Sequence, residues 1–133
     1  MRIMGIDYGR ARLGIALSDE SGIIAMPLVA LNARKDLKQN LGDLVRDRNV
    51  ERIVIGLPLD RNGNSGPMGD EVREFAERVT GWFGVECVLW DERYTSMQAS
   101  GAARKSGSGK DKSKNDMAAA TIILRSYLDS INR

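Results

Sequence analysis

Carboxylates are the side chains of this sequence best suited to chemistry, because its 133 residues include no histidine. Asp7 closes the first apolar segment, Glu92 follows the apolar segment Val85 to Trp90, and Asp116 begins an apolar helical stripe. The lack of imidazole excludes a Ser-His pair and the commonest general base. If the acids converge they need cations, and hard divalent ions with oxygen ligands meet that need.

Each acid also has an explanation that requires no function. Asp7 fits the first position of a turn, and Asp116 in a first helical turn suits the helix dipole. Glu92 fits a surface ion pair with Arg93. Asp91 competes with Glu92 for the role at this strand end, because adjacent strand residues point to opposite faces and the sequence leaves the register open.

Composition predicts a single globular domain over residues 1–133. Apolar residues make up 42% and charged residues 29%, which are ordinary values for a soluble protein. The apolar runs are too short to cross a bilayer, and no signal-like leader begins the chain. The lone cysteine, Cys87, has no partner for an internal disulfide and is expected to be a core thiol. We therefore expect a cytoplasmic protein with no membrane role.

Positive charge is concentrated in one part of the chain. The net charge is only +2, but the stretch from Arg93 to Lys114 holds six basic residues and one acidic residue. Such an excess suits a polyanion. The alternative is a solvated linker, since Lys105 to Lys114 is rich in Gly, Ser and Lys.

The pattern of apolar residues predicts five strands and several helices. The first two strands form a hairpin around Gly9, and Pro27 places the third at a sheet edge or a bulge. The expected elements are strands at Ile3–Ile6, Leu13–Leu17, Ile23–Leu31, Arg52–Leu57 and Val85–Trp90, and helices at Asp36–Arg48, from Pro67, from about Thr95 to Ala103, and at Asn115–Ile131.

This order predicts an α/β fold. Strands one to three, with short connections, should form an antiparallel meander, and strands four and five, each entered through a helix, should run parallel to the first. The result is a five-stranded mixed sheet with helices on its faces. Sites in such sheets lie beyond the carboxyl ends of the strands, so Asp7, the corner at Gly56–Pro58 and Asp91-Glu92 should converge.

The sequence resembles the bacterial YqgF family, whose members are also called RuvX and Holliday junction resolvases. The resemblance spans Met1 to about Leu128. Its ordered motifs are Gly5-Ile6-Asp7-Tyr8-Gly9 with Arg12-Leu13-Gly14-Ile15-Ala16, then Gly56-Leu57-Pro58-Leu59, Asp91-Glu92-Arg93-Tyr94-Thr95 and Asp116-Met117-Ala118-Ala119. The family motif often has Leu where Tyr94 stands, a departure that leaves the carboxylates intact.

The resemblance implies a ribonuclease H-like fold and metal-dependent phosphodiester hydrolysis, in maturation of the 5′ end of 16S ribosomal RNA. The alternative is DNA junction cleavage, proposed for the family from similarity to RuvC. Carried over by position, Asp7, Glu92 and Asp116 are the catalytic residues and metal ligands. Two Mg²⁺ or Mn²⁺ ions would screen the phosphodiester and activate water. Basic side chains would guide the backbone of the nucleic acid: Arg12, Arg93, Lys105, Lys110, Lys112 and Lys114.

Two rival functions remain open. An actin-like phosphotransferase also opens with a hairpin that has an Asp between glycines, but such proteins need two domains around a cleft. A non-catalytic module that binds ribosome precursors is the rival from another class. The sequence leaves open whether the substrate is precursor ribosomal RNA or branched or single-stranded DNA, whether cutting is exo- or endonucleolytic, and whether the protein is a monomer or homodimer.

Overall fold

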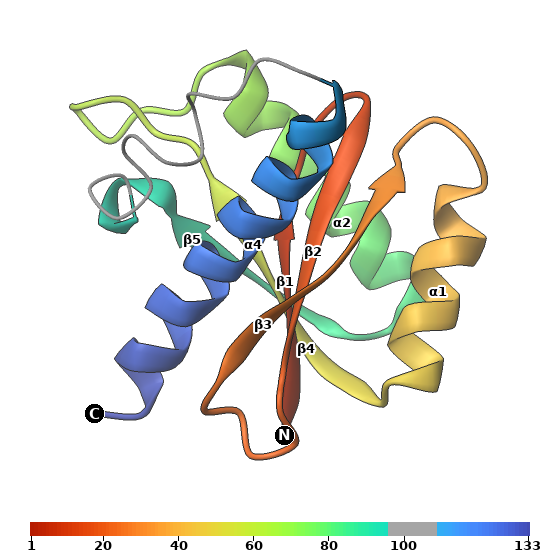
Figure 1. Cartoon of the computed structure of the whole chain (residues 1–133). Coiled ribbons are helices and arrows are strands. Elements are labelled where there is room, and N and C mark those ends of the chain that lie inside the picture. Colours follow the sequence, from red (N-terminus) through yellow and green to blue (C-terminus); the bar gives the residue numbers. More distant parts are fainter. Residues whose placement is uncertain (96–108) are drawn as a thin grey trace.

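The computed structural model describes residues 1–95 and 109–133, without the side chains of 109–111, and its strands form one mixed sheet. The strands are β1 (Arg2–Asp7), β2 (Arg12–Ser18), β3 (Ala25–Asn32), β4 (Val50–Leu57) and β5 (Glu86–Asp91). They lie in the order β3-β2-β1-β4-β5. The β1–β2 and β2–β3 pairs are antiparallel, whereas β1–β4 and β4–β5 are parallel, which confirms the predicted mixed sheet (Figure 1).

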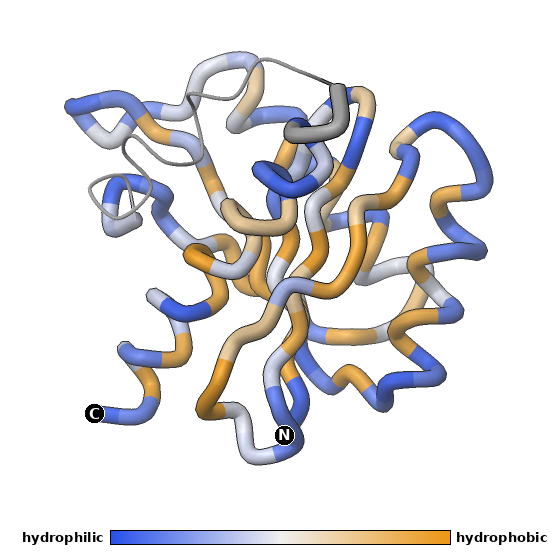
Figure 2. Tube along the Cα trace, in the orientation of Figure 1, coloured by the Kyte–Doolittle hydropathy of each residue, from blue (hydrophilic) through white to orange (hydrophobic). Residues whose placement is uncertain are grey.

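Helices cover both faces of the sheet (Figure 1). The described helices are α1 (Leu37–Asp47), α2 (Pro67–Phe83) and α4 (Gly109–Ile131), with a short 3₁₀ turn, η1 (Glu92–Tyr94), after β5. Leu41 of α1 and Phe75 of α2 are fully buried in the cluster on one face, and Leu124 of α4 is fully buried in the cluster on the other. Figure 2 shows the apolar residues concentrated along the central strands. Among the described residues, none of the helices could span a membrane.

Pro27 lies where the sequence predicts. β3 is an edge strand, so the missing N–H of Pro27 leaves no gap between two inner strands. Pro27 pairs with Ala16, the next pair along is Val29 with Ile15, and the register shifts between them. Pro27 therefore lies both on an edge strand and at the irregularity in the pairing of β2 with β3.

Helix α4 departs from the sequence prediction at its start. It begins at Gly109 rather than at Asn115, so the expected linker is wrong over 109–114. Those six residues carry no apolar side chain, and a helical period could not be seen there. The stripe on the sheet side is confirmed at Ala120, Ile123 and Tyr127, but Ile131 is 47% exposed. The helix expected from Thr95 to Ala103 lies, beyond Thr95, outside the described residues.

Glycines let α4 lie directly on the strands. A Cβ at Gly5 would come 2.7 Å from Leu124 Cβ and 2.9 Å from the Ala120 carbonyl oxygen. A Cβ at Gly14 would overlap the backbone carbonyl of Asp116. The start of α4 is therefore held against β1 and β2 at the end of the sheet where β1, β4 and β5 finish (Figure 1).

Candidate active site

Asp7 is the last residue of the central strand β1. Ile3 and Gly5 face α4, and side chains alternate along a strand, so Asp7 is on the same face. Asp7 pairs with Gly14 of β2, and the preceding residue pairs with Ile55 of β4. Asp7 thus lies between two strand positions that lack side chains, Gly14 and Gly56.

Asp116 reaches the same place from the helix. Gly14, which pairs with Asp7, is also the strand residue on which the Asp116 backbone rests. The Asp116 carboxylate accepts a hydrogen bond from Arg12, whose Nε lies 2.8 Å from Oδ2. The two side chains are 37% and 24% exposed, so the ion pair is partly shielded from water. Arg12, expected to guide nucleic acid, is engaged with an acid of the site.

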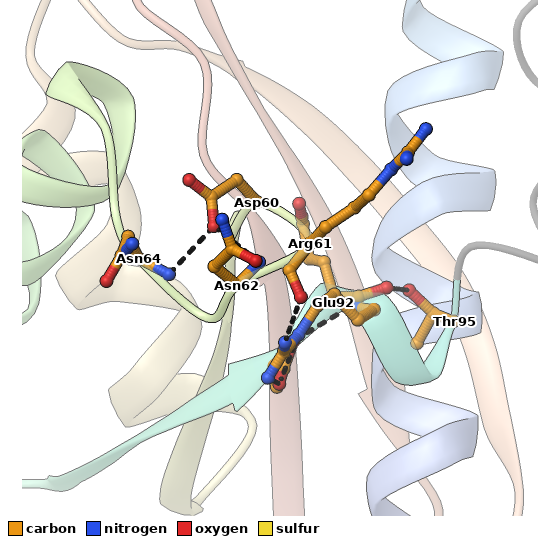
Figure 3. A network of polar contacts seen from close by, with 8 residues as sticks. Asp60, Arg61, Asn62, Asn64, Glu92 and Thr95 are labelled. Atoms are coloured by element: carbon orange, nitrogen blue, oxygen red, sulfur yellow. Dashed lines mark hydrogen bonds and ion pairs between the residues drawn. The ribbon is translucent and has the colours of Figure 1, made fainter.

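Glu92 lies on the α4 face beside β4. A Cβ at Gly56 would stand 2.6 Å from Glu92 Oε1 and 2.6 Å from Ile123 Cδ1. Gly56 therefore leaves the space that the Glu92 carboxylate enters. The Glu92 carbonyl also accepts from the Thr95 hydroxyl at 2.8 Å, which closes the turn (Figure 3).

Asp91 has a different environment from Glu92. Trp90 packs on the α4 face, so Asp91 belongs to the opposite one. Its carboxylate caps η1 by accepting from the Arg93 backbone N–H, and it pairs with the Arg93 guanidinium at 2.7 Å. These hydrogen bonds from Arg93 hold the pKa of Asp91 below its usual range. This geometry supports Glu92 over Asp91 as the acid that shares a site with Asp7.

The acids share one face and one end of the sheet, and their donor atoms suit a hard cation. Asp7, Glu92 and Asp116 offer carboxylate oxygens, the ligands that Mg²⁺ and Mn²⁺ prefer. As the side chains stand, no three acidic or cysteine groups within residues 1–95 and 109–133 are close enough together to hold an ion. In this structure the Asp116 carboxylate is held by Arg12 instead.

The turn between β1 and β2 is tied to α2. Arg10 forms an ion pair with Glu71 through Nε and Nη2, and the Tyr8 hydroxyl lies 3.4 Å from Glu71 Oε1. The Arg10 hydrogen bonds lower the pKa of Glu71. Burial, and then Glu71, raise the pKa of Tyr8. These contacts fix the backbone that leads out of Asp7.

The loop after β4 places Arg61 near Glu92, and this residue is not among the basic residues that the sequence predicts for the site. Asp60 Oδ1 accepts from the backbone N–H groups of Asn62 and Asn64, and Arg93 donates to the Arg61 carbonyl at 3.5 Å (Figure 3). The loop therefore lies beside Glu92, with the Arg61 side chain exposed. Arg61 forms no ion pair with any described residue. The signal was available, since Arg61 follows the predicted strand end at Gly56–Pro58 by a few residues.

The predicted basic residues lie in different situations. Lys112 and Lys114 are exposed on the first turns of α4, the helix that carries Asp116. Arg93, like Arg12, is engaged in an ion pair with a neighbouring acid. Lys110 is in α4 but its side chain is not described, and Lys105 lies outside the described residues.

Sequence relatives cover almost the whole chain. The model of a family described as RuvX, Holliday junction resolvase, matches residues 1–130. A protein of Protochlamydia amoebophila (strain UWE25) named "Putative pre-16S rRNA nuclease" is 41% identical over 97% of this chain and 93% of its own length. A protein of the same name from Bacillus subtilis (strain 168) is 38% identical over 99% of this chain and its entire length.

Solved structures agree on the fold. RuvC of T. thermophilus in complex with a Holliday junction substrate superposes with a TM-score of 0.63 at 11% identity, over 99% of this chain and 96% of that one. The fowlpox virus resolvase in complex with Holliday junction DNA gives a TM-score of 0.61 at 11% identity over the full length of both. The ribonuclease H-like α/β fold is thereby confirmed, and the extent of the sequence match shows that this chain belongs to the RuvX family of Holliday junction resolvase-like nucleases.

Proposed function

We propose that this chain is a nuclease that hydrolyses phosphodiester bonds with divalent ions, and that it acts in maturing the 5′ end of precursor 16S ribosomal RNA. One observation carries the chemistry: Asp7, Glu92 and Asp116 lie around the side-chain-free positions Gly14 and Gly56 on one face of the sheet. The choice of substrate is supported by the names of the relatives, 41% and 38% identical over nearly the whole chain.

Each acid has a part in the proposed mechanism. Asp7 is on the central strand of the sheet and would be a ligand of the divalent ions. Glu92 and Asp116 would hold the ions together with Asp7. Bound Mg²⁺ or Mn²⁺ supplies charge neutralisation of the phosphodiester and activates the attacking water.

Residues around the acids position the substrate. Arg12, once released from Asp116, is close enough to the site to receive a phosphate oxygen in exchange for the carboxylate. Lys112 and Lys114 extend from the same helix, and Arg61 from the loop beside Glu92, so the backbone of the nucleic acid meets cations on two sides. Such contacts are independent of sequence and sensitive to salt.

A nuclease assay with metals varied tests the proposal. Purified protein should shorten a precursor 16S RNA fragment with Mg²⁺ or Mn²⁺, stop with chelator, and lose at least about a hundredfold in rate as Asp7→Asn or Glu92→Gln, the scale expected for loss of a group that stabilises transition-state charge. Asp91→Asn is the matched control, because that carboxylate belongs to the other face. Cleavage that persists after chelation, or in both site variants, would refute the assignment.

The second candidate is cleavage of branched DNA, because the family is described as Holliday junction resolvase. A four-way DNA junction in the same assay separates the two, and the preferred substrate is the one cut at the higher kcat/KM. A protein that binds both and cuts neither would instead be a binding module. We place the protein in the cytoplasm, where precursor ribosomal RNA of bacteria is processed.

A further inference from the structure

Tyr94 presents an aromatic ring to solvent next to the candidate active site. It is the most exposed of the large apolar side chains among the described residues, at 66%, whereas Tyr127 nearby is 6% exposed. Tyr94 is the last residue of η1, the turn that begins with Glu92. Among the described residues, its one ring contact is with Trp90, and most of the ring surface faces solvent.

Trp90 and Tyr127 form a firm base beneath Tyr94. The centroids of the Trp90 and Tyr94 rings lie 5.6 Å apart, and those of Trp90 and Tyr127 lie 5.4 Å apart at 87°. The Trp90 indole N–H donates to the Ser126 hydroxyl at 3.0 Å, which fixes the indole plane. The three rings thus run from the buried Tyr127 through the partly buried Trp90 to the exposed Tyr94.

A groove of about 570 Å³ opens beside these rings. It is lined by Trp90, Tyr94, Ser126, Asp129, Ser130 and Arg133. Asp129 and Arg133 are exposed and form no ion pair with each other or with another described residue. The groove therefore combines an aromatic wall with a hydrogen-bond acceptor and a cation, and its size suits a single nucleobase better than a duplex.

The groove begins next to one of the acids, because Tyr94 and Glu92 belong to the same 3₁₀ turn. Trp90 pairs with Gly56 across β4 and β5, and Gly56 is the position beside which the Glu92 carboxylate lies. A strand whose phosphate binds beside Glu92 would therefore pass close to the Tyr94 ring. Unpaired bases are commonly held in this way, by stacking on aromatic side chains.

We propose that Tyr94 is a stacking platform for one unpaired nucleobase of the substrate, next to the scissile phosphate, with Trp90 as its support. The inference rests on the proposed nuclease function and deepens it, because it makes a single-stranded segment at the cut site the preferred substrate. Arg133 would receive the adjoining phosphate, and Asp129 an amino group of the base.

The test removes the Tyr94 ring by mutation and one base of the RNA by an abasic site, first separately and then together. A short single-stranded RNA carries one abasic site that is moved along the strand, and its binding is measured with chelator present so that nothing is cut. In the wild-type protein, one abasic position should weaken binding about 5- to 150-fold, the range for loss of one base–aromatic stack. Tyr94→Ala should weaken binding of the intact strand by the same factor and abolish the dependence on that abasic position.

Matched variants separate stacking from a structural role. Tyr94→Phe keeps the ring and should bind as wild type, Tyr94→Leu keeps apolar area without a π face and should behave as Tyr94→Ala, and Met26→Ala, 60% exposed on β3, should change nothing. Equal effects of every abasic position in wild type and Tyr94→Ala would overturn the inference, even if metal-dependent cleavage is intact. If one abasic position weakens binding in the wild-type protein only, and no substrate is cleaved, the stacking inference stands and the nuclease function is refuted.

Discussion

The guanidinium of Arg12 lies where a metal ion would compete for Asp116. Arg12 Nε donates to Asp116 Oδ2 at 2.8 Å, across the strand position Gly14 that pairs with Asp7. An ion that binds the same oxygen of Asp116 would therefore compete with a cation of the protein. The displaced guanidinium remains at the site, where it can bind a phosphate oxygen with a planar, bidentate geometry. We therefore expect one residue to couple ion entry to substrate binding.

Arg12→Ala should move ion affinity and cleavage in opposite directions. Without the competitor, Mn²⁺ should bind about 1.5- to 5-fold more tightly, which corresponds to the ~0.2–1 kcal/mol that a partly exposed ion pair contributes. Cleavage at saturating metal should fall, because the phosphate loses its partner. Titration with Mn²⁺ followed by electron paramagnetic resonance measures the first effect independently of activity. Weaker Mn²⁺ binding by the variant would show that Arg12 organises the carboxylates rather than competing for them.

Gly56→Ala should impair catalysis more than folding. The new methyl group would stand 2.6 Å from Glu92 Oε1 and Ile123 Cδ1, both ends of flexible side chains, so the protein can fold after they move. We expect a cost of about 1–3 kcal/mol in unfolding free energy from overpacking, and a larger proportional loss of kcat. Gly81→Ala is the matched control, because nothing lies within 4 Å of its Cβ, and it should stabilise α2 by about 0.4–1 kcal/mol. Urea unfolding and cleavage rates of both variants give the comparison, and unchanged kcat in Gly56→Ala would contradict the placement of Glu92.

The sequence predicts the sheet well because its signals are local. The hairpin, the apolar run of β4 and Pro27 at the edge each follow from a few adjacent residues. The contact of Gly14 with Asp116 joins residues about a hundred positions apart, and no local pattern reports it. The start of α4 is hidden for another reason, since its first turns lack the apolar residues that reveal a helix.

The site is predictable in part for the same physical reasons. That Asp7 and Asp91-Glu92 lie at the same end of the sheet follows from chain order, because β1 and β5 both run parallel to β4, which lies between them. Which of the two adjacent acids faces α4 depends on register, and the structure places Glu92 against Gly56. Ion pairs cannot be predicted from spacing, so the engagement of Arg12 with Asp116 and of Arg93 with Asp91 emerges only from the structure. The catalytic and metal-binding roles of the acids stay predictions.

Lys112→Ala combined with Lys114→Ala should weaken binding of nucleic acid and reduce its dependence on salt. Both side chains are exposed on the helix that carries Asp116. The slope of log K against log salt should drop by roughly 0.7–0.9 for each phosphate that the variant no longer neutralises. Lys35→Ala with Lys38→Ala removes the same charge around the start of α1, on the other side of the sheet, and should leave the slope unchanged. Equal slopes in the two double variants would mean that the lysines of α4 are only a solvated surface.

Asp91 should stabilise the folded protein at neutral pH and lose this contribution as the pH falls. Hydrogen bonds from Arg93 lower the pKa of Asp91 in the folded protein, so the unfolded chain binds the proton more readily. The stabilisation is complete above the ordinary carboxyl pKa of about 3.9 and is lost as the pH falls through the lower folded value. Asp91→Asn should therefore be less stable than wild type at neutral pH, and the difference should shrink below about pH 4. Urea unfolding at a series of pH values measures the difference directly.

Arg93, which pairs with Asp91, provides the control for the predicted pH dependence. In an Arg93→Ala background the first cause of the lowered pKa is gone, so adding Asp91→Asn should change the pH dependence of stability far less than it does in wild type. Arg93→Ala also frees the Arg61 carbonyl, so the loop after β4 is without a hydrogen bond that Asp91→Asn leaves in place. Cleavage should then fall more in Arg93→Ala than in Asp91→Asn, because only the former releases the loop beside Glu92. The reverse order would mean that Asp91 itself belongs to the reacting site.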